Sequence, residues 1–149
     1  LYDHPANRFV AGFIGSPSMN FFDGELTETD GALFFVAPGL RLPIDPRRQP
    51  ALREQRNDPR VTLGLRPEHF RLSDPAGLPA DAAASPLRAH VEVVEPMGAE
   101  IHLHLSTGPH SFIARAEGHA RVKADEEIDL LADMTKSRWF DPQTGAAIG

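Results

Sequence analysis

The sequence has no cysteine, one tryptophan and one tyrosine among its 149 residues. Without cysteine the chain can form neither disulfides nor thiolate-ligated metal sites. No apolar run approaches the roughly 20 residues that a helix needs to cross a bilayer, and no charged-then-apolar leader begins the sequence. We therefore expect neither a disulfide-stapled domain nor a membrane anchor.

Excess positive charge is also lacking, because the formal net charge is −6. Binding to nucleic acid requires clustered Lys and Arg that displace counterions, so we expect no nucleic-acid partner. A local basic cluster does occur in a proline-rich stretch, and we interpret it as a solvated connection, with contact to an acidic partner as the alternative. The cluster consists of Arg41, Arg47, Arg48, Arg53, Arg56 and Arg60.

The first residues predict a short α-helix that ends near Gly15-Ser16-Pro17. Asp3 or His4 can cap this helix, and Pro5 falls in its first turn, where a proline costs no hydrogen bond. Phe9 and Phe13 share one apolar face with Val10 and Ile14. Because so short a helix is marginal alone, this face must dock on something, and Phe9 and Phe13 are predicted interface residues.

From Met19 onward the pattern changes to short extended runs separated by turn residues. Asp30-Gly31 supplies the left-handed turn of a hairpin between the first two runs. We expect one helical turn at residues 49–55 and a loop at residues 73–86, where Pro, Gly and Ala dominate. The predicted strands are 20–26, 33–36, 41–44, 61–65, 70–72, 87–95, 101–105, 110–116, 127–132 and 139–140, with a last turn into 146–148.

Many short strands with regular turns predict a mainly β fold, a small barrel of the oligonucleotide/oligosaccharide-binding (OB) type. The two strand clusters, before and after the loop, suggest two interleaved β lobes. We assign residues 1–18 to the helix and linker and residues 19–149 to the β domain.

Two polar patterns could carry chemistry. His102 and His104 form His-x-His, and Glu100 falls on the same side of the strand, so the three could begin a metal site. Alternation with apolar residues also explains them as the wet face of a half-buried strand, and we expect no metal.

Arg66-Pro67-Glu68-His69 follows an apolar strand, and Pro67 holds Arg66 extended. No nucleophile lies beside this pattern, so we interpret it as a structural corner. Trp139 and Phe140 are candidate interface anchors, with packing in the core as the alternative. We predict no catalytic, cofactor-binding or metal-binding residue.

Three stretches together carry a family resemblance: Tyr2 to Asn20, Gly64-Leu65-Arg66-Pro67-Glu68-His69, and Phe140-Asp141-Pro142-Gln143-Thr144-Gly145. Their order and spacing resemble the C-terminal regulatory region of ATP-binding subunits of carbohydrate ABC importers, of the maltose and sn-glycerol-3-phosphate type. The sequence departs from the family at Lys123-Ala124-Asp125-Glu126, where a Gly-containing turn is more usual.

The resemblance implies a TOBE-type regulatory domain that follows a nucleotide-binding domain and that contacts a second copy of itself. It also implies permease subunits and a regulatory protein as partners, and a cytoplasmic location beside the bacterial inner membrane. The Gly-rich phosphate loop and the other ATPase motifs are absent from this sequence, so ATP and Mg²⁺ are expected only in the nucleotide-binding domain. The alternative is a stand-alone OB-like module that binds a small oxyanion.

Overall fold

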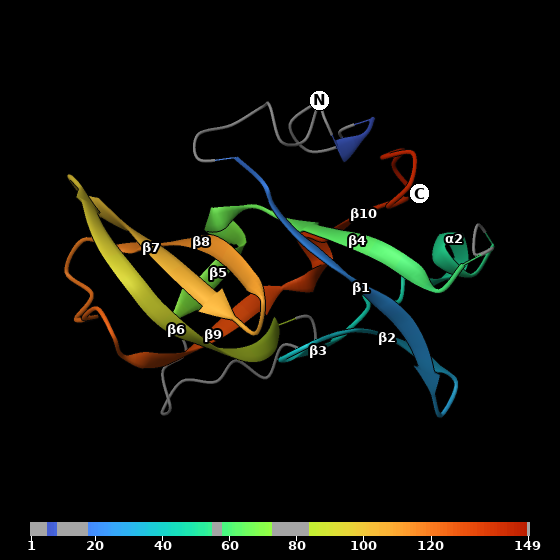
Figure 1. Ribbon diagram of the computed structural model, residues 1–149, viewed down its shortest axis with the longest axis horizontal. Helices are drawn as coiled ribbons and strands as arrows, with labels where there is room; N and C mark the ends of the chain where they lie inside the picture. The colour runs from blue at the N-terminus through green and yellow to red at the C-terminus, as the bar shows by residue number, and fades with distance from the viewer. Residues whose placement is uncertain (1–5, 9–17, 55–57, 73–83, 149) are drawn as a thin grey trace.

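Alternation of apolar and polar residues gives strands along most of this chain, and the strands assemble into two five-stranded antiparallel sheets (Figure 1). The computed structural model describes residues 6–8, 18–54, 58–72 and 84–148. The first sheet has the order β10 (Arg138–Phe140), β4 (Arg60–Leu65), β1 (Asn20–Thr29), β2 (Ala32–Ala37) and β3 (Leu40–Pro43). The second has the order β5 (Phe70–Leu72), β9 (Glu127–Asp133), β6 (Ala84–Met97), β7 (Glu100–Thr107) and β8 (His110–Glu117). The mainly β prediction is confirmed.

The β1–β2 hairpin forms where the turn residues predict it. Asp30 and Gly31 have φ angles of 52° and 81°, and Thr29 pairs with Ala32 across the turn. Two consecutive left-handed residues match the right-handed twist of the flanking strands, which is why Asp-Gly is favoured there.

Strand β6 begins at Ala84, three residues earlier than the predicted strand start at residue 87. Pro86 pairs with Leu131 of β9, whereas pairing with β7 starts only at His90. A proline is tolerated because the opposite edge of β6 has no partner strand at that point. The register shifts between Val91 and Val93, close to where β6 passes from β9 to β7.

Among the described residues, three short helices connect the strands: α2 (Gln49–Glu54), η1 (Pro67–His69) and η2 (Met134–Lys136). The helical turn predicted at residues 49–55 is confirmed as α2. Leu42, Ile44 and Leu52 are buried, so the segment that carries the basic cluster is part of the folded body, whereas the side chains of Arg41, Arg47, Arg53 and Arg60 are exposed to solvent, as expected. Among the described residues no helix is long and apolar enough to cross a membrane.

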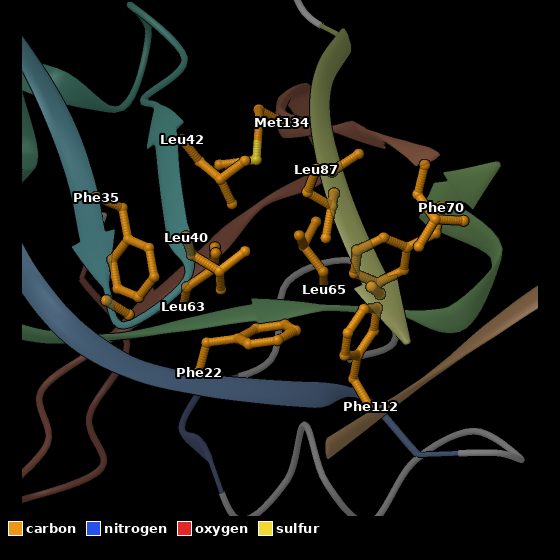
Figure 2. Close-up of a cluster of buried hydrophobic side chains, with 14 of the residues drawn as sticks. Phe22, Phe35, Leu40, Leu42, Leu63, Leu65, Phe70, Leu87, Phe112 and Met134 are labelled. Atoms are coloured by element: carbon orange, nitrogen blue, oxygen red, sulfur yellow. The ribbon is translucent and has the colours of Figure 1, made fainter. Parts of the chain in front are cut away.

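One hydrophobic core runs through both sheets (Figure 2). Its centre is an aromatic cluster in which the ring of Phe22, from the first sheet, lies 6.4 Å from that of Phe70 and 5.2 Å from that of Phe112. Phe70 and Phe112, both from the second sheet, are 5.1 Å apart. Burial of three aromatic side chains at the junction fixes the two sheets against each other.

The sheets are interleaved along the sequence, because β10 returns to the first sheet after the whole second sheet has formed. This confirms the two interleaved lobes. After the predicted last turn, Ala146 and Ala147 make isolated bridges with Asn7 and Phe140. The N-terminal helix prediction, with Phe9 and Phe13, lies outside the described residues except for residues 6–8.

Candidate functional site

The three stretches that carry the family resemblance meet at one corner of the molecule. A Cβ added to Gly64 would lie 2.5 Å from Sδ of Met19 and 2.9 Å from Cε2 of Phe140. Met19 is the next-to-last residue of the first stretch, Gly64 opens the second and Phe140 opens the third. Glycine is therefore required at position 64, because the other two stretches pack directly against its backbone.

The third stretch forms a turn held by its own side chains. Oδ1 of Asp141 accepts hydrogen bonds from the backbone N–H groups of Gln143 (2.8 Å) and Thr144 (3.0 Å). Gly145 has a φ of 78° and donates its N–H to the carbonyl oxygen of Asp141 at 2.8 Å. An aspartate that caps its own turn fixes the direction in which the chain leaves it.

This turn and the residues after it are hydrogen-bonded to residues 6–8. The N–H of Arg8 donates to the carbonyl oxygen of Gly145 at 2.8 Å, and the N–H of Ala147 donates to that of Ala6 at 3.1 Å. The Arg8 guanidinium lies 4.6 Å from the centre of the Phe21 ring and 3.5 Å from Asp23. Backbone pairing, a cation–π contact and an ion pair thus fasten the incoming segment to the first sheet.

The Arg66-Pro67-Glu68-His69 pattern joins the two sheets, since it follows β4 and leads into β5. Arg66 is extended (φ −81°, ψ 156°), and Pro67 begins the turn η1, which the N–H of His69 closes on the carbonyl oxygen of Arg66 at 3.0 Å. The Arg66 side chain is buried, and both Arg66 and Glu68 interact within the protein. Burial lowers the pKa of His69 and so favours its neutral form.

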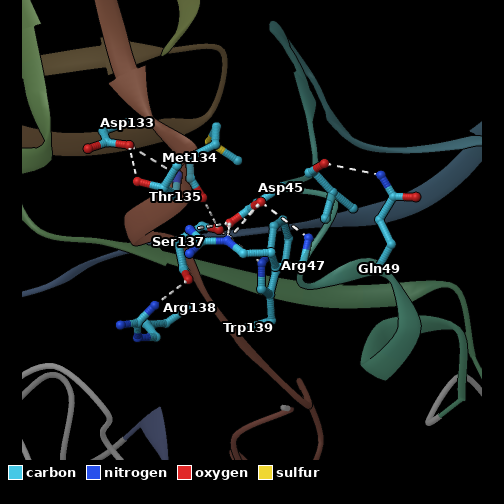
Figure 3. A network of polar contacts seen from close by, with 10 residues as sticks. Asp45, Arg47, Gln49, Asp133, Met134, Thr135, Ser137, Arg138 and Trp139 are labelled. Atoms are coloured by element: carbon cyan, nitrogen blue, oxygen red, sulfur yellow. Dashed lines mark hydrogen bonds and ion pairs between the residues drawn. The ribbon is translucent and has the colours of Figure 1, made fainter. Parts of the chain in front are cut away.

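Trp139 and Phe140 lie inside the protein, with 2% and 0% of their surface exposed. The Trp139 ring lies 5.6 Å from that of Phe35, and its Nε1 donates to Oγ of Ser137 at 3.1 Å (Figure 3). Their side chains are therefore not available to a partner in this fold, and packing in the core, the alternative reading, accounts for them.

A polar network supports the same region (Figure 3). Oδ1 of Asp133 accepts the N–H of Thr135 at 3.1 Å, and Oγ of Ser137 donates to the carbonyl oxygen of Met134 at 2.6 Å. Burial acts to raise the pKa of Asp45, but hydrogen bonds from Arg47 and its charge outweigh burial, and the pKa is lowered. Asp45 is thus held ionised at neutral pH.

The basic cluster is largely neutralised within the chain. Arg47, Arg53 and Arg60 form ion pairs with carboxylates at distances of 3.0, 2.8 and 2.7 Å, and the Arg41 guanidinium lies 3.9 Å from the centre of the Phe34 ring. Arg56 lies outside the described residues. Arg48 forms no ion pair among the described residues, although its charge helps to lower the pKa of Asp45, so only the paired arginines of the cluster offer little field to an acidic protein.

The His-x-His pair binds carboxylates separately. Nε2 of His102 lies 2.9 Å from Glu100, and Nε2 of His104 lies 3.1 Å from Glu95. His102 is buried, which corrects its assignment to the wet face, whereas His104 is partly exposed. Among the described residues no group of three or more His, Cys, Asp or Glu is placed to hold a metal ion.

Sequence reasoning missed a pocket of about 740 Å³ that opens between the two edge strands of the second sheet. β5 and β8 are the edges of this sheet, and they are not hydrogen-bonded to each other. The lining includes the apolar side chains of Phe70, Leu72 and Ala116, which we call the floor. It also includes six ionisable side chains, which we call the rim: Glu68, Arg71, Glu100, Arg115, Glu117 and His119. The pocket depends on the curl of the whole sheet, so no local pattern could have found it.

Two family models match this chain, one described as the MalK OB fold domain (residues 15–70) and one as the TOBE domain (residues 63–140). A solved structure of the cytoplasmic molybdate-binding protein ModG, with molybdate bound, is similar in fold. Its TM-score is 0.60 at 14% identity, over 83% of this chain and 96% of that one. These matches confirm the OB and TOBE folds.

Relatives of known sequence match nearly the whole chain. An uncharacterized ABC transporter ATP-binding protein, y4oS of Sinorhizobium fredii, is 41% identical over 99% of this chain and 36% of its own length. The trehalose/maltose import ATP-binding protein MalK of Thermococcus litoralis is 40% identical over 99% of this chain and 39% of its own length. The chain thus spans about two fifths of the length of these relatives.

Proposed function

The chain belongs to the TOBE domain family, and from that premise we propose that it is the non-catalytic regulatory and dimerisation region of the ATP-binding subunit of a bacterial ABC importer for sugars or related solutes. The observation that supports this most is that 99% of the chain aligns with the ATP-binding proteins y4oS and MalK while covering only 36% and 39% of their length. In this proposal the ATP- and Mg²⁺-binding residues lie in the remainder of the subunit.

The corner where the three stretches meet supports the same proposal. Residues 6–8 are fastened by the Asp141–Gly145 turn, so movement of anything attached upstream is transmitted to the first sheet through backbone hydrogen bonds. A regulatory domain needs such a rigid connection, because a loose linker would not carry an orientation.

The proposed partners are a second copy of the chain, the permease subunits and a regulatory protein, at the cytoplasmic face of the inner membrane. Val93 and Met97 are the large hydrophobic side chains that stand most exposed among the described residues, at 52% and 50%. Both lie on β6, which makes this strand the first target for mutagenesis of self-association.

The oxyanion-binding alternative is less well supported. The similarity to the molybdate-binding protein concerns the fold, since only 14% of residues are identical. The pocket described above carries three carboxylates, Glu68, Glu100 and Glu117, against two guanidiniums, so it has no excess of positive charge to attract an oxyanion.

The solution mass of the chain, measured by light scattering over a range of concentrations, tests the proposal. We expect a dimer, and we expect Val93→Asp with Met97→Asp to weaken it, whereas the matched surface change Arg88→Asp should not. A monomer at every concentration would contradict self-association. Magnesium-dependent ATP hydrolysis by the chain alone would contradict its non-catalytic role.

A further inference from the structure

The pocket between β5 and β8 combines an apolar floor with a charged rim. Phe70, Leu72, Ala116 and Ala120 contribute to its lining, and Phe70 belongs to the aromatic cluster that joins the two sheets. A volume of about 740 Å³ lies within the range of small-molecule pockets. The aromatic cluster therefore holds Phe70 in place at the pocket.

The rim mixes both signs of charge at close range. Nε of Arg115 lies 3.7 Å from Oε2 of Glu100, and Nε2 of His119 lies 2.9 Å from Oε2 of Glu117. Arg71 makes no ion pair with any described residue and is exposed at the rim. With carboxylates and guanidiniums nearly balanced, the rim creates little net field and does not select a simple anion or cation.

The backbone adds hydrogen-bonding groups along the free edge of β8. Asn20 caps this edge at Ile113, donating Nδ2–H to its carbonyl oxygen at 2.8 Å and accepting its N–H at 2.9 Å. In a strand, alternate residues direct their N–H and C=O groups to the same edge. The backbone groups of Arg115 and Glu117 therefore face the same edge as Ile113, beyond the reach of Asn20.

We propose that this pocket binds a neutral polyhydroxylated small molecule, a sugar or a polyol. Carboxylates accept hydrogen bonds from hydroxyl groups and guanidiniums donate to hydroxyl oxygens, so a rim of both kinds matches a ligand whose every hydroxyl does both. The C–H face of a sugar ring packs on an apolar floor. The balanced charge disfavours molybdate or phosphate, and the apolar floor disfavours a bare metal ion.

Binding would let an importer subunit respond to the solute that accumulates on its own side of the membrane; this regulatory meaning rests on the proposed function, whereas the binding itself does not. A ligand seated between β5 and β8 contacts both edges of the curled sheet and the turn η1, which connects to the first sheet through β4. It would stiffen the second sheet by bridging its two edge strands, which do not pair with each other.

A titration of the 149-residue chain with maltose and with trehalose, followed by two-dimensional NMR of the backbone amides, tests the inference. We expect saturable shifts at Leu72, Ala116 and Ala120 with a dissociation constant on the order of 1 mM. Arg71→Ala and Glu117→Gln should each weaken binding about tenfold, since each removes a charged hydrogen-bonding group. The matched exposed variant Arg88→Ala, outside the pocket, should leave binding unchanged.

Three results would overturn the inference. The first is the absence of saturable shifts with either sugar. The second is sugar binding that Arg71→Ala and Glu117→Gln do not weaken, which would place the sugar elsewhere. The third is a preference for molybdate or glycine betaine over both sugars, which would assign the pocket to charged ligands. None of these bears on the solution mass or on ATP hydrolysis, so failure of this inference is distinguishable from failure of the proposed function.

Discussion

The two sheets share one core but differ in their charged residues. The described histidines lie in or beside the second sheet, at positions 69, 90, 102, 104, 110 and 119, whereas strands β1, β2, β3, β4 and β10 contain none. The first sheet is flanked by ion pairs between arginine and carboxylates, such as Arg60–Asp58 at 2.7 Å. Arginine and carboxylate keep their charges near neutral pH and histidine does not. The first sheet is thus electrostatically constant, and the second can respond to its surroundings.

The largest effect should come from the core of the first sheet. Trp139→Ala removes a side chain that is 2% exposed and packed on Phe35, and we expect the free energy of unfolding to fall by about 3–5 kcal/mol. Met97→Ala, on a half-exposed side chain of the second sheet, should change it by about 0.5 kcal/mol or less. Urea unfolding followed by circular dichroism measures both. Equal losses of unfolding free energy in Trp139→Ala and Met97→Ala would contradict this difference between the buried and the exposed side chain.

The link between the sheets is next in size. Asn20→Ala leaves the N–H and C=O of Ile113 without their partner, and we expect a loss of about 1–3 kcal/mol, with faster hydrogen exchange at Ile113. Asn20→Asp keeps an acceptor for the N–H but no donor for the C=O, so its effect should be intermediate. Unchanged exchange at Ile113 in Asn20→Ala would show that the cap does not form in solution.

The pKa values of His69 and His90 should be shifted in opposite directions. Burial lowers the pKa of His69, so its contribution to stability is fully present above its unfolded value near 6.5 and is lost as the pH falls below that value. The hydrogen bond to Glu127 raises the pKa of His90, so its contribution is present below 6.5 and is lost as the pH rises through the raised pKa. NMR titration of the imidazoles should show that His69 titrates at a lower pH than His90. Glu127→Gln should lower the pKa of His90 and leave His69 unchanged.

The smallest effect is expected on the outer surface of the second sheet. Arg88 and Asp129 form an ion pair at 3.2 Å, but both side chains are more than 60% exposed. Arg88→Ala should therefore change the free energy of unfolding by about 0.5 kcal/mol or less, and by still less in high salt. A loss above about 1 kcal/mol would show that this surface is less solvated than the structure indicates.

Local sequence patterns predicted the turns and strands well, but they predicted the burial and the exact bounds of these elements less well. Asp30-Gly31 predicted its hairpin because the turn depends on two residues. Asp125, where the sequence departs from the usual glycine, adopts a φ of 66° and so supplies the left-handed residue itself. The burial of His102 and the start of β6 at Ala84 depend on neighbouring strands, and sequence reasoning placed both wrongly.

Long-range placement was beyond the sequence for the same reason. The pocket needs strands β5 and β8 to approach, and the corner needs Met19, Gly64 and Phe140 to meet. Each contact joins residues far apart in the chain, whose distances no periodicity encodes. The family resemblance identified the three stretches but did not explain why they occur together. The structure shows that they contact one another.

The bond between Ala6 and Ala147 also sets an order of events during synthesis. This hydrogen bond closes a loop that spans almost the whole described chain. Such a contact is among the slowest to form, because the entropy of closing the loop is lost before the contact can stabilise the fold. The turn at residues 141–145 leaves the ribosome after both sheets have been made. Residues 6–8 can therefore form these hydrogen bonds only after both sheets have been synthesised. A chain that ends before residue 141 would lack the partners of residues 6–8.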